Sequence, residues 1–501
     1  MDIRFQNLGP EHWKAQVMLA PACQGEDILH QCPELDKAAP WLAVAPARRD
    51  FQGKNGELAL FHGHPDLPVP RVLAVGLGPR EKADAAVLRK AVAAAVQRCR
   101  EQGFASILLP EPALARLPGG PERLVEESVC AALLALYRFT MLKKAEADEP
   151  VDPQWLALGF DGQSVPDGAH AAARRGERAA GAICLARDLA NMPANLLPPE
   201  ALARRAAELA KECGFTCTIL ESDALAEQGM GALLAVGQGS ARPPCLVVLE
   251  HAPQGHEQEK PLIFVGKGLT FDTGGICLKP AANMQQMKCD MSGAAAVLAA
   301  IAALAREDAP RRVVGLLACA ENMPGGRAMR PGDVVRAASG DSVEIVNTDA
   351  EGRLALCDAL AYAQKQWTPA AVVDIATLTG ACAVALGTEV AGLFCDDAAL
   401  AERIVAAGGA CGENYWQLPL WKPYAESLKS EVADICHMGP REGGAINAAL
   451  FLQHFLQKGV RWAHLDIAGV DWNAKKTPLC PVGASGFGAR TLLELARGGV
   501  Q

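Results

Sequence analysis

A chain of 501 residues is too long for one small hydrophobic core, so two or more domains are expected. Half of the residues are hydrophobic and 21% are charged, which is ordinary for a globular protein. The formal net charge of −9 argues against broad non-specific affinity for nucleic acid or acidic membranes, although it does not exclude a local basic patch.

The distribution of apolar residues and cysteines gives no sign of secretion or membrane insertion. The first residues lack a basic segment followed by an apolar stretch, so no secretory signal is recognised. The longest apolar stretch, residues 294–305, is far shorter than the roughly 20 residues that cross a bilayer. The 17 cysteines are scattered without a Cys-x-x-Cys pair, which is typical of reduced, buried thiols. We therefore expect a cytoplasmic protein with no structural disulfides and no membrane partner.

Residues 1–165 read as a smaller N-terminal α/β domain. Strand-like runs at 41–44, 58–61, 72–75 and 105–109 alternate with helical patterns, the clearest at 83–103. Residues 144–168 are rich in acidic residues, Pro and Gly and mark a boundary. The helical pattern that follows predicts a connecting helix within residues 166–190.

Residues 191–501 read as a larger C-terminal α/β domain. Short apolar runs at 246–249, 262–265, 313–318, 372–375 and 464–467 suit central strands, and Ala-rich helical segments separate them. Strands that are apolar on both faces, with helices between them, predict a central, mostly parallel sheet.

One segment of this domain concentrates charge. Asp349, Glu351 and Arg353 fall between a predicted strand at 342–346 and a predicted helix at 354–362. In an open α/β sheet, ligands bind at such strand-to-helix turns. The alternative is a solvated acidic turn whose carboxylates are favoured by the positive end of the helix dipole.

Two further junctions carry acidic residues. Asp272 lies in a Gly-rich turn predicted after the strand at 262–265, together with Lys267 and with Lys279 seven residues later. Asp290 comes directly before a predicted helix. Because side chains on such junctions can converge on one cleft, we expect four carboxylates to meet there.

Four converging carboxylates would repel one another and raise each other's pKa values. Two divalent cations would remove that conflict and would create a hydrolytic site. Oxygen ligands alone favour Mg²⁺ or Mn²⁺, whereas a nitrogen ligand from Lys267 would favour Zn²⁺ or another transition metal. Lys267 can coordinate only as a neutral amine. The alternative for Lys267 is a phosphate contact or a surface position, although the P-loop spacing is missing.

Together these segments resemble the leucyl aminopeptidase (cytosol aminopeptidase) family. The most specific match is the octapeptide Asn347-Thr348-Asp349-Ala350-Glu351-Gly352-Arg353-Leu354. Further matches lie at 187–189, 191–193, 265–268, 271–275, 287–293, 376–381 and 462–469, so the resemblance covers most of residues 180–490. It implies a two-metal exopeptidase that removes N-terminal residues, mainly Leu and other apolar ones, from short peptides.

The resemblance also implies a role for individual residues. The metal ligands for two Zn²⁺ or Mn²⁺ ions would be Lys267, Asp272, Asp290, Asp349 and Glu351. Lys279 would stabilise the substrate carbonyl oxygen, and Arg353 would hold a bicarbonate ion that acts as general base, since no histidine lies near these segments in the sequence. The substrate-binding positions would be Met287, Asn347, Thr377, Leu378 and Gly380. The alternatives are core packing for Met287, turn chemistry for Asn347 and a plain ion pair for Arg353.

Several features of the sequence allow more than one interpretation. His437 stands where the family often has Asn, and an ordinary histidine is favoured there over an extra metal ligand. The family also implies a homohexamer whose active sites face an interior cavity. A DNA-binding role would need a basic track, for which Arg311-Arg312 and Lys475-Lys476 are candidates, and the net charge disfavours it. A two-metal phosphoester hydrolase is the third alternative.

Overall fold

The computed structural model describes residues 1–501 except 45–49, 115, 145–148, 163 and 499–501. The chain divides into two compact units, and each is described by itself. The first unit comprises Met1–Ala180 and Lys475–Val482, and the second comprises the rest. The division falls within helix α6 (Asp167–Asn191), so the predicted connecting helix contributes residues to both units.

The strands of the first unit form a six-stranded sheet in the order β1-β6-β5-β2-β4-β3. Within the part of the chain that the structure describes, β3 and β4 are antiparallel and the other neighbouring pairs are parallel. The strands are β1 (Asp2–Gln6), β2 (Val17–Ala22), β3 (Leu58–His62), β4 (Arg71–Gly76), β5 (Ser106–Pro110) and β6 (Trp155–Gly159). The helices are α1 (Ile28–Gln31), α2 (Leu35–Ala38), α3 (Ala85–Glu101), α4 (Glu111–Leu114) and α5 (Pro121–Ala135), with 3-10 helices η1 (Pro10–His12), η2 (Pro40–Val44) and η4 (Arg80–Lys82).

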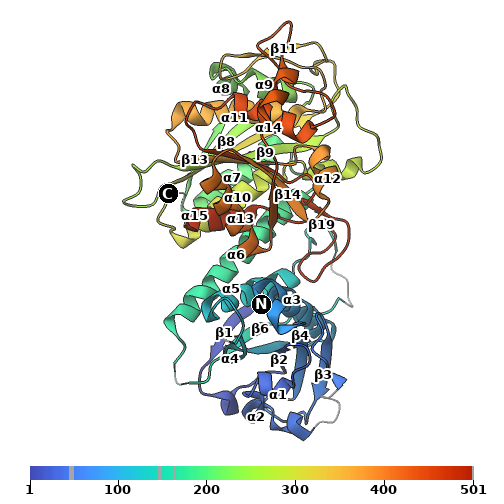
Figure 1. Ribbon diagram of the computed structural model, residues 1–501, viewed down its shortest axis with the longest axis vertical. Helices are drawn as coiled ribbons and strands as arrows, with labels where there is room; N and C mark the ends of the chain where they lie inside the picture. Colours follow the sequence, from blue (N-terminus) through green and yellow to red (C-terminus); the bar gives the residue numbers. More distant parts are fainter. Residues whose placement is uncertain (45–49, 115, 145–148, 163, 499–501) are drawn as a thin grey trace. The chain divides into compact units, whose positions relative to one another are not determined.

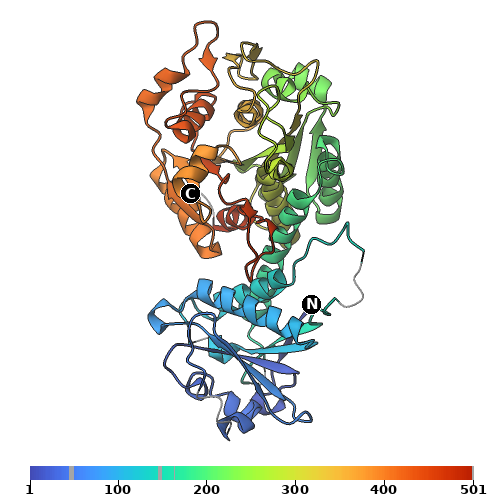
Figure 2. The ribbon, with the colours of Figure 1, turned by 90° about the vertical axis from the view of Figure 1, so that its right-hand side faces the viewer.

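Helices cover both faces of this sheet. Because successive side chains of a strand point to opposite sides, strand β2 contributes to a core on each face. Val17 and Leu19 of β2 pack in one core with α3 and α5, whose long helices are seen in Figure 2. Met18 and Ala20 pack in the other core with α1 and α2.

The strand predicted at 41–44 is wrong. These residues belong to η2, in which only Leu42 is buried. Four apolar residues in a row do not distinguish a strand from a helical turn. Pro40 has no N–H to give to a sheet and is well suited to the first position of a helix.

The second unit is built on an eight-stranded sheet in the order β15-β14-β17-β13-β9-β10-β8-β7. Its central strands β17, β13, β9 and β10 run parallel, and the antiparallel pairs lie on either side of them. The strands are β7 (Thr216–Leu220), β8 (Cys245–His251), β9 (Leu262–Asp272), β10 (Val313–Asn322), β13 (Ala371–Ala376), β14 (Val390–Cys395), β15 (Asn414–Gln417) and β17 (Trp462–Asp466). The prediction of a smaller N-terminal α/β domain and a larger C-terminal α/β domain with a central, mostly parallel sheet is confirmed.

Helices also cover both faces of the larger sheet (Figure 1). Helix α10 lies on one face with α7 and α15, and α11 lies on the other with α9 and α14. The helices of this unit are α7 (Pro199–Cys213), α8 (Ser222–Glu227), α9 (Gly231–Gly237), α10 (Ser292–Glu307), α11 (Glu351–Gln366), α12 (Gly380–Leu386), α13 (Ala398–Cys411), α14 (Gly444–His454) and α15 (Ala489–Gly498), with 3-10 helices η5 (Met284–Cys289) and η6 (Lys422–Leu428).

One helical stretch among the described residues, Met284–Glu307, is long and apolar enough to cross a membrane, yet 89% of its apolar 18-residue window is buried in the protein. Residues Ser292 to Leu304 of α10 are all buried against the sheet and its neighbouring helices. Such burial is that of a core helix, and the many alanines let the helix lie close to the strands.

Strand β9 is longer than the sequence predicts. The Gly-rich segment that follows residue 265 is not a turn, because the strand continues to Asp272 and pairs with β10 as far as Asn322. Lys267 therefore lies within a central strand. Position 266 requires glycine, because a Cβ atom there would come within 2.6 Å of the backbone of Ala294 in α10.

The strand that precedes Asp349 belongs to a different sheet. It is β12 (Ser342–Glu344), which pairs with β11 (Val334–Arg336) and β16 (Ile435–Cys436) in a small three-stranded sheet. A further two-stranded sheet is formed by β18 (Trp472–Asn473) and β19 (Gly483–Ala484). The predicted strand existed, but an apolar run does not reveal which sheet it joins.

Candidate active site

The predicted site residues meet at the carboxyl ends of the parallel strands in the second unit. A cavity of about 400 Å³ lies there, between the ends of β9 and β13 and the start of α11. Of the predicted residues it is lined by Lys267, Asp272, Lys279, Met287, Asp290, Asp349, Glu351, Arg353, Thr377, Leu378 and Gly380. Asn347 is the predicted residue that does not line it.

Three buried carboxylates form the centre of the cavity wall. Asp272 is the last residue of β9, Asp290 directly follows η5, and Glu351 is the first residue of α11. One oxygen atom from each lies within 4.8 Å of the others, and the residues are at most 7% exposed. Asp349 adds a fourth carboxylate at the more open side of the cluster, where 35% of its side chain is exposed.

Lys267 lies among these carboxylates. Its Nζ atom is 2.8 Å from Asp290 Oδ2 and 2.9 Å from Glu351 Oε1, and it donates a hydrogen bond of 2.9 Å to the carbonyl oxygen of Thr377. Lys267 reaches this position because it shares the α11-facing side of β9 with Ile263 and Val265. Burial alone lowers the pKa of Lys267, but the neighbouring carboxylates outweigh burial and raise the pKa above its ordinary value.

Thr377 connects two of the predicted residues. Its hydroxyl donates to Asp290 Oδ1 at 2.6 Å, while its carbonyl oxygen accepts from Lys267. The segment that follows β13 is fixed by Asp466 at the end of β17, which accepts hydrogen bonds from the backbone of Leu378 and from the hydroxyl of Thr379.

Lys279 approaches the cluster from the loop after β9. Its Nζ atom is 2.7 Å from Asp272 Oδ2 and also contacts Asp349 Oδ1. The loop turns back at Gly274, whose φ of +86° is readily adopted only by glycine, so that the backbone N–H of Lys279 donates to the Thr273 carbonyl. Burial again lowers the pKa of Lys279, and Asp272 and Glu351 raise it above the ordinary value, so the side chain is an ammonium ion.

The electrostatics of the cluster fit a centre for divalent cations. Burial raises the pKa of Asp290 to about 8 and also raises the pKa values of Glu351 and Asp349. Glu351 Oε2 is buried and has no hydrogen-bond partner among the described residues. Such carboxylates are costly to ionise unless a cation neutralises them, and the oxygen atom without a partner can coordinate one. Both features are expected of residues that bind a metal ion.

Arg353 lies in the first turn of α11 and is 6% exposed. Its Nη1 atom donates a hydrogen bond of 3.0 Å to the carbonyl oxygen of His437, whereas Nε has no partner among the residues described. Burial lowers the pKa of Arg353 to about 10. A buried guanidinium with a free N–H on the cavity wall fits a small planar anion.

His437 and Asn347 support the turn that carries Asp349. His437 is fully buried, and its Nε2 atom lies 2.8 Å from the carbonyl oxygen of Asn347, to which it must donate. Its Nδ1 atom accepts from the backbone N–H of Val346 at 3.3 Å. The side-chain oxygen of Asn347 accepts from the backbone N–H of Asp349. Both ring nitrogens of His437 are thus engaged, and burial lowers its pKa to about 4, so it is a neutral core histidine.

Two residues of the site, Asn322 and Asp471, were not predicted from the sequence. Asn322, the last residue of β10, donates to Asp272 Oδ1 at 2.8 Å and to the carbonyl oxygen of Thr348 at 2.9 Å. The feature that indicates Asn322 as a site residue is its position at the end of the strand next to β9. Asp471 also lines the cavity, and no pattern in the sequence singles it out.

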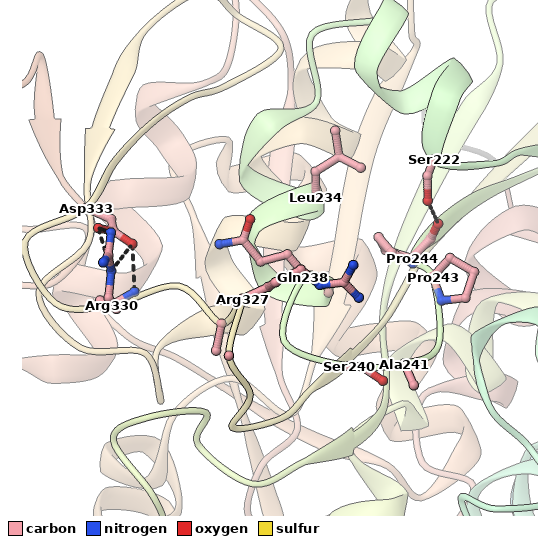
Figure 3. Close-up of a pocket in the computed structure, with 13 residues that line it drawn as sticks. Ser222, Leu234, Gln238, Ser240, Ala241, Pro243, Pro244, Arg327, Arg330 and Asp333 are labelled. Carbon is pink, nitrogen blue, oxygen red and sulfur yellow. Dashed lines mark hydrogen bonds and ion pairs between the residues drawn. The ribbon is translucent and has the colours of Figure 1, made fainter.

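A separate cavity of about 690 Å³ lies elsewhere in the second unit (Figure 3). Its charged side chains include Arg330, which is paired with Asp333 at 2.9 Å, and the exposed Arg327. None of the predicted residues lines it, and it has no cluster of converging carboxylates among its described residues. Chemistry rather than volume therefore identifies the smaller cavity as the candidate active site.

An α/β fold with a buried carboxylate–lysine cluster at the ends of parallel strands defines the class of metal-dependent hydrolases. The sequence profile of the cytosol aminopeptidase family, catalytic domain, matches residues 184–493, and the profile of its N-terminal domain matches residues 29–146. The chain belongs to the cytosol aminopeptidase family and is a metal-dependent aminopeptidase. The resemblance seen in the sequence is confirmed.

Relatives and solved structures agree with this assignment. A probable cytosol aminopeptidase of Desulfovibrio desulfuricans is 80% identical over 500 residues, covering 100% of both chains. One of Nitratidesulfovibrio vulgaris is 54% identical over 504 residues, covering 100% of this chain and 99% of the relative. The bottromycin maturation enzyme BotP in complex with Mn is 38% identical with a TM-score of 0.84, covering 97% and 99% of the two chains. A mutant of tomato leucine aminopeptidase is 32% identical with a TM-score of 0.86, covering 100% and 97%.

Proposed function

We propose that this aminopeptidase removes Leu and other mainly apolar first residues from short peptides with the help of two divalent cations. The observation that carries the proposal is the convergence of Asp272, Asp290 and Glu351 within 4.8 Å, with Lys267 in contact with two of them. Lys267, Asp272, Asp290, Asp349 and Glu351 would hold the ions. When bound, the ions supply Lewis-acid polarisation of the scissile carbonyl and activation of a water molecule.

The donor set bears on which metal is used. An amine ligand from Lys267 beside carboxylate oxygens favours Zn²⁺ or Mn²⁺ over Mg²⁺. The Mn complex of the related bottromycin maturation enzyme supports Mn²⁺ as one occupant. Metal binding at Lys267 requires loss of the proton that the carboxylates now favour, so binding is expected to release a proton.

Lys279 is proposed as the group that stabilises negative charge on the substrate. Its ammonium group lies on the cavity wall, and Asp272 and Asp349 hold it in place. An ammonium ion fixed before the reaction can donate to the carbonyl oxygen and stabilise the charge that develops there.

Arg353 is proposed to hold bicarbonate, which would supply the general base. The support is the free Nε–H of a buried guanidinium on the cavity wall. Among the described residues, the two histidines that interact electrostatically with Arg353, His437 and His464, are both fully buried, and neither lines the cavity.

The side chain of the first substrate residue is proposed to lie against Met287, Thr377, Leu378 and Gly380. These residues share the cavity with the small residues Ala383 and Ala468. A wall of this kind can accept a branched apolar side chain such as Leu.

The chain is further proposed to work in the cytoplasm as a homohexamer. Several large apolar side chains of the second unit are exposed, among them Trp416 at 65%, Trp421 at 58% and Val384 at 91%. Exposed aromatic residues of this size favour burial against another protein surface. The molar mass in solution tests the hexamer.

Turnover of Leu-para-nitroanilide tests the proposed function. The purified protein should release para-nitroaniline with Mn²⁺ or Zn²⁺, and a chelator should abolish the release because the carboxylate cluster alone has no activated water. Absence of turnover with several metals and several first residues would refute the proposal.

A further inference from the structure

Asp471 is a carboxylate in the candidate active site to which the proposed chemistry gives no task. It lines the same cavity as Met287, Thr377 and Ala468, and it is 7% exposed. Its position is fixed by the turn after β17, where its backbone N–H donates to the carbonyl oxygen of Ile467 at 3.1 Å. The carboxylate therefore forms part of the wall that the first substrate residue would meet.

Little in the surroundings of Asp471 stabilises the negative charge of its carboxylate. Its Oδ2 atom accepts a hydrogen bond from the thiol of Cys289 at 3.0 Å, and a thiol is a poor donor. Among the residues that the structure describes, Asp471 forms no ion pair, and the thiol of Cys289 is its side-chain partner. Burial raises its pKa to about 7, which reflects the same lack of a compensating cation.

The neighbouring charges are all committed to other partners. Lys267, which attracts the Asp471 carboxylate, is bound to Asp290 and Glu351. Asp466, which repels it, accepts hydrogen bonds after β13. Lys288, whose Nζ atom lies 6.0 Å from the ring centre of Trp472 beside Asp471, donates to the carbonyl oxygen of Asn191.

A buried carboxylate without a cation gains from a ligand that brings one. The same cavity wall also carries apolar or small residues, among them Met287 and Ala468, which can accept the aliphatic stem of a long side chain. We propose that Asp471 is a specificity-determining residue that admits first residues with a cationic side chain, Lys and Arg, to this aminopeptidase. The inference rests on the proposed function and extends its substrates beyond apolar first residues.

The test compares substrates that differ in charge but share an aliphatic stem. The ratio of kcat/KM for Lys-para-nitroanilide to that for norleucine-para-nitroanilide is measured with the wild type and with Asp471→Asn. We expect the wild type to turn over the Lys substrate at least as well, and the ratio to fall at least tenfold in Asp471→Asn because the charge is lost while the shape is kept. Asp471→Glu, which keeps the charge, should restore most of the ratio.

Two results would overturn the inference. One is a ratio that stays within threefold of the wild type in Asp471→Asn. The other is a wild type that prefers norleucine over Lys by more than tenfold, which needs no variant and so does not depend on how the variants fold. A wild type that turns over neither substrate, nor Leu-para-nitroanilide, would instead refute the proposed function itself.

Discussion

At the scale of single residues, Gly352 controls where the Lys267 amine can lie. A Cβ atom at position 352 would come within 2.5 Å of Lys267 Cε and 2.8 Å of Nζ. The end of a lysine side chain can move away at little cost to folding, and alanine is favoured over glycine within a helix. The strain of an added methyl group would therefore fall on the position of the amine.

Gly352→Ala should bind Mn²⁺ at least tenfold more weakly than the wild type and should lose a comparable factor in kcat, while its unfolding midpoint in urea stays close to that of the wild type. Titration calorimetry and the para-nitroanilide assay measure the two effects. Gly409→Ala is the matched control, since Gly409 also lies in a helix and an added Cβ there meets nothing within 4 Å. Equal metal affinity in the two variants would contradict the assigned position of Lys267.

The positions of the site residues could be predicted because they stand at recognisable places in the sequence. Asp290 lies just before one Ala-rich helix, Glu351 begins another, and Asp272 ends the strand that starts with the apolar run at 262–265. The supporting residues could not be predicted in the same way. His437 acts from a segment about 90 residues beyond the turn it supports, and one of its contacts is its own carbonyl oxygen, which no side-chain pattern reveals.

At the scale of elements, α11 is anchored by a buried carboxylate as well as by apolar packing. Asp358 accepts hydrogen bonds from the backbone N–H of Leu233 in α9 at 2.8 Å and from that of Ala338 at 2.7 Å. Asp358 is fully buried, and burial raises its pKa from the ordinary 3.8 to about 7. The folded state therefore binds a proton at this residue more tightly than the unfolded chain does.

The sign of the pH effect follows from that difference. A raised pKa in the folded state gives a stabilisation that is complete below about pH 4 and is lost as the pH rises through about 7. From pH 5 to pH 8 the wild type should lose up to roughly 3 kcal/mol of unfolding free energy through this group, as an upper bound. Asp358→Asn should show a correspondingly flatter dependence in urea unfolding, although its stability is lower at every pH. Parallel pH profiles for the two proteins would contradict this account of Asp358.

The sequence predicts the locations of strands better than their ends. The apolar runs at 246–249, 313–318 and 372–375 do lie in strands β8, β10 and β13. The extent of β9 could not be predicted from the sequence, because Gly266, Lys267 and Gly268 interrupt its apolar run and the residues beyond are held by pairing with β10. Pairing partners come from distant segments, so local patterns do not contain them.

At the scale of the whole molecule, the candidate active site belongs to one of the two units. Every residue that lines the cavity falls between residues 267 and 472, within the second unit. The first unit adds no described residue to the cavity wall. The proposed chemistry therefore depends on the second unit. Strand β9 and the segments that precede or begin α10 and α11 would hold the cations.

The metal content of the purified protein tests this central claim most directly. After dialysis against Mn²⁺ or Zn²⁺, elemental analysis should find two ions per chain in the wild type. In Glu351→Ala it should find at most one, with activity lower by at least a thousandfold, because a carboxylate at the centre of the cluster is lost. A fully active wild type that holds no metal, or a Glu351→Ala variant that keeps two ions and wild-type turnover, would contradict the account.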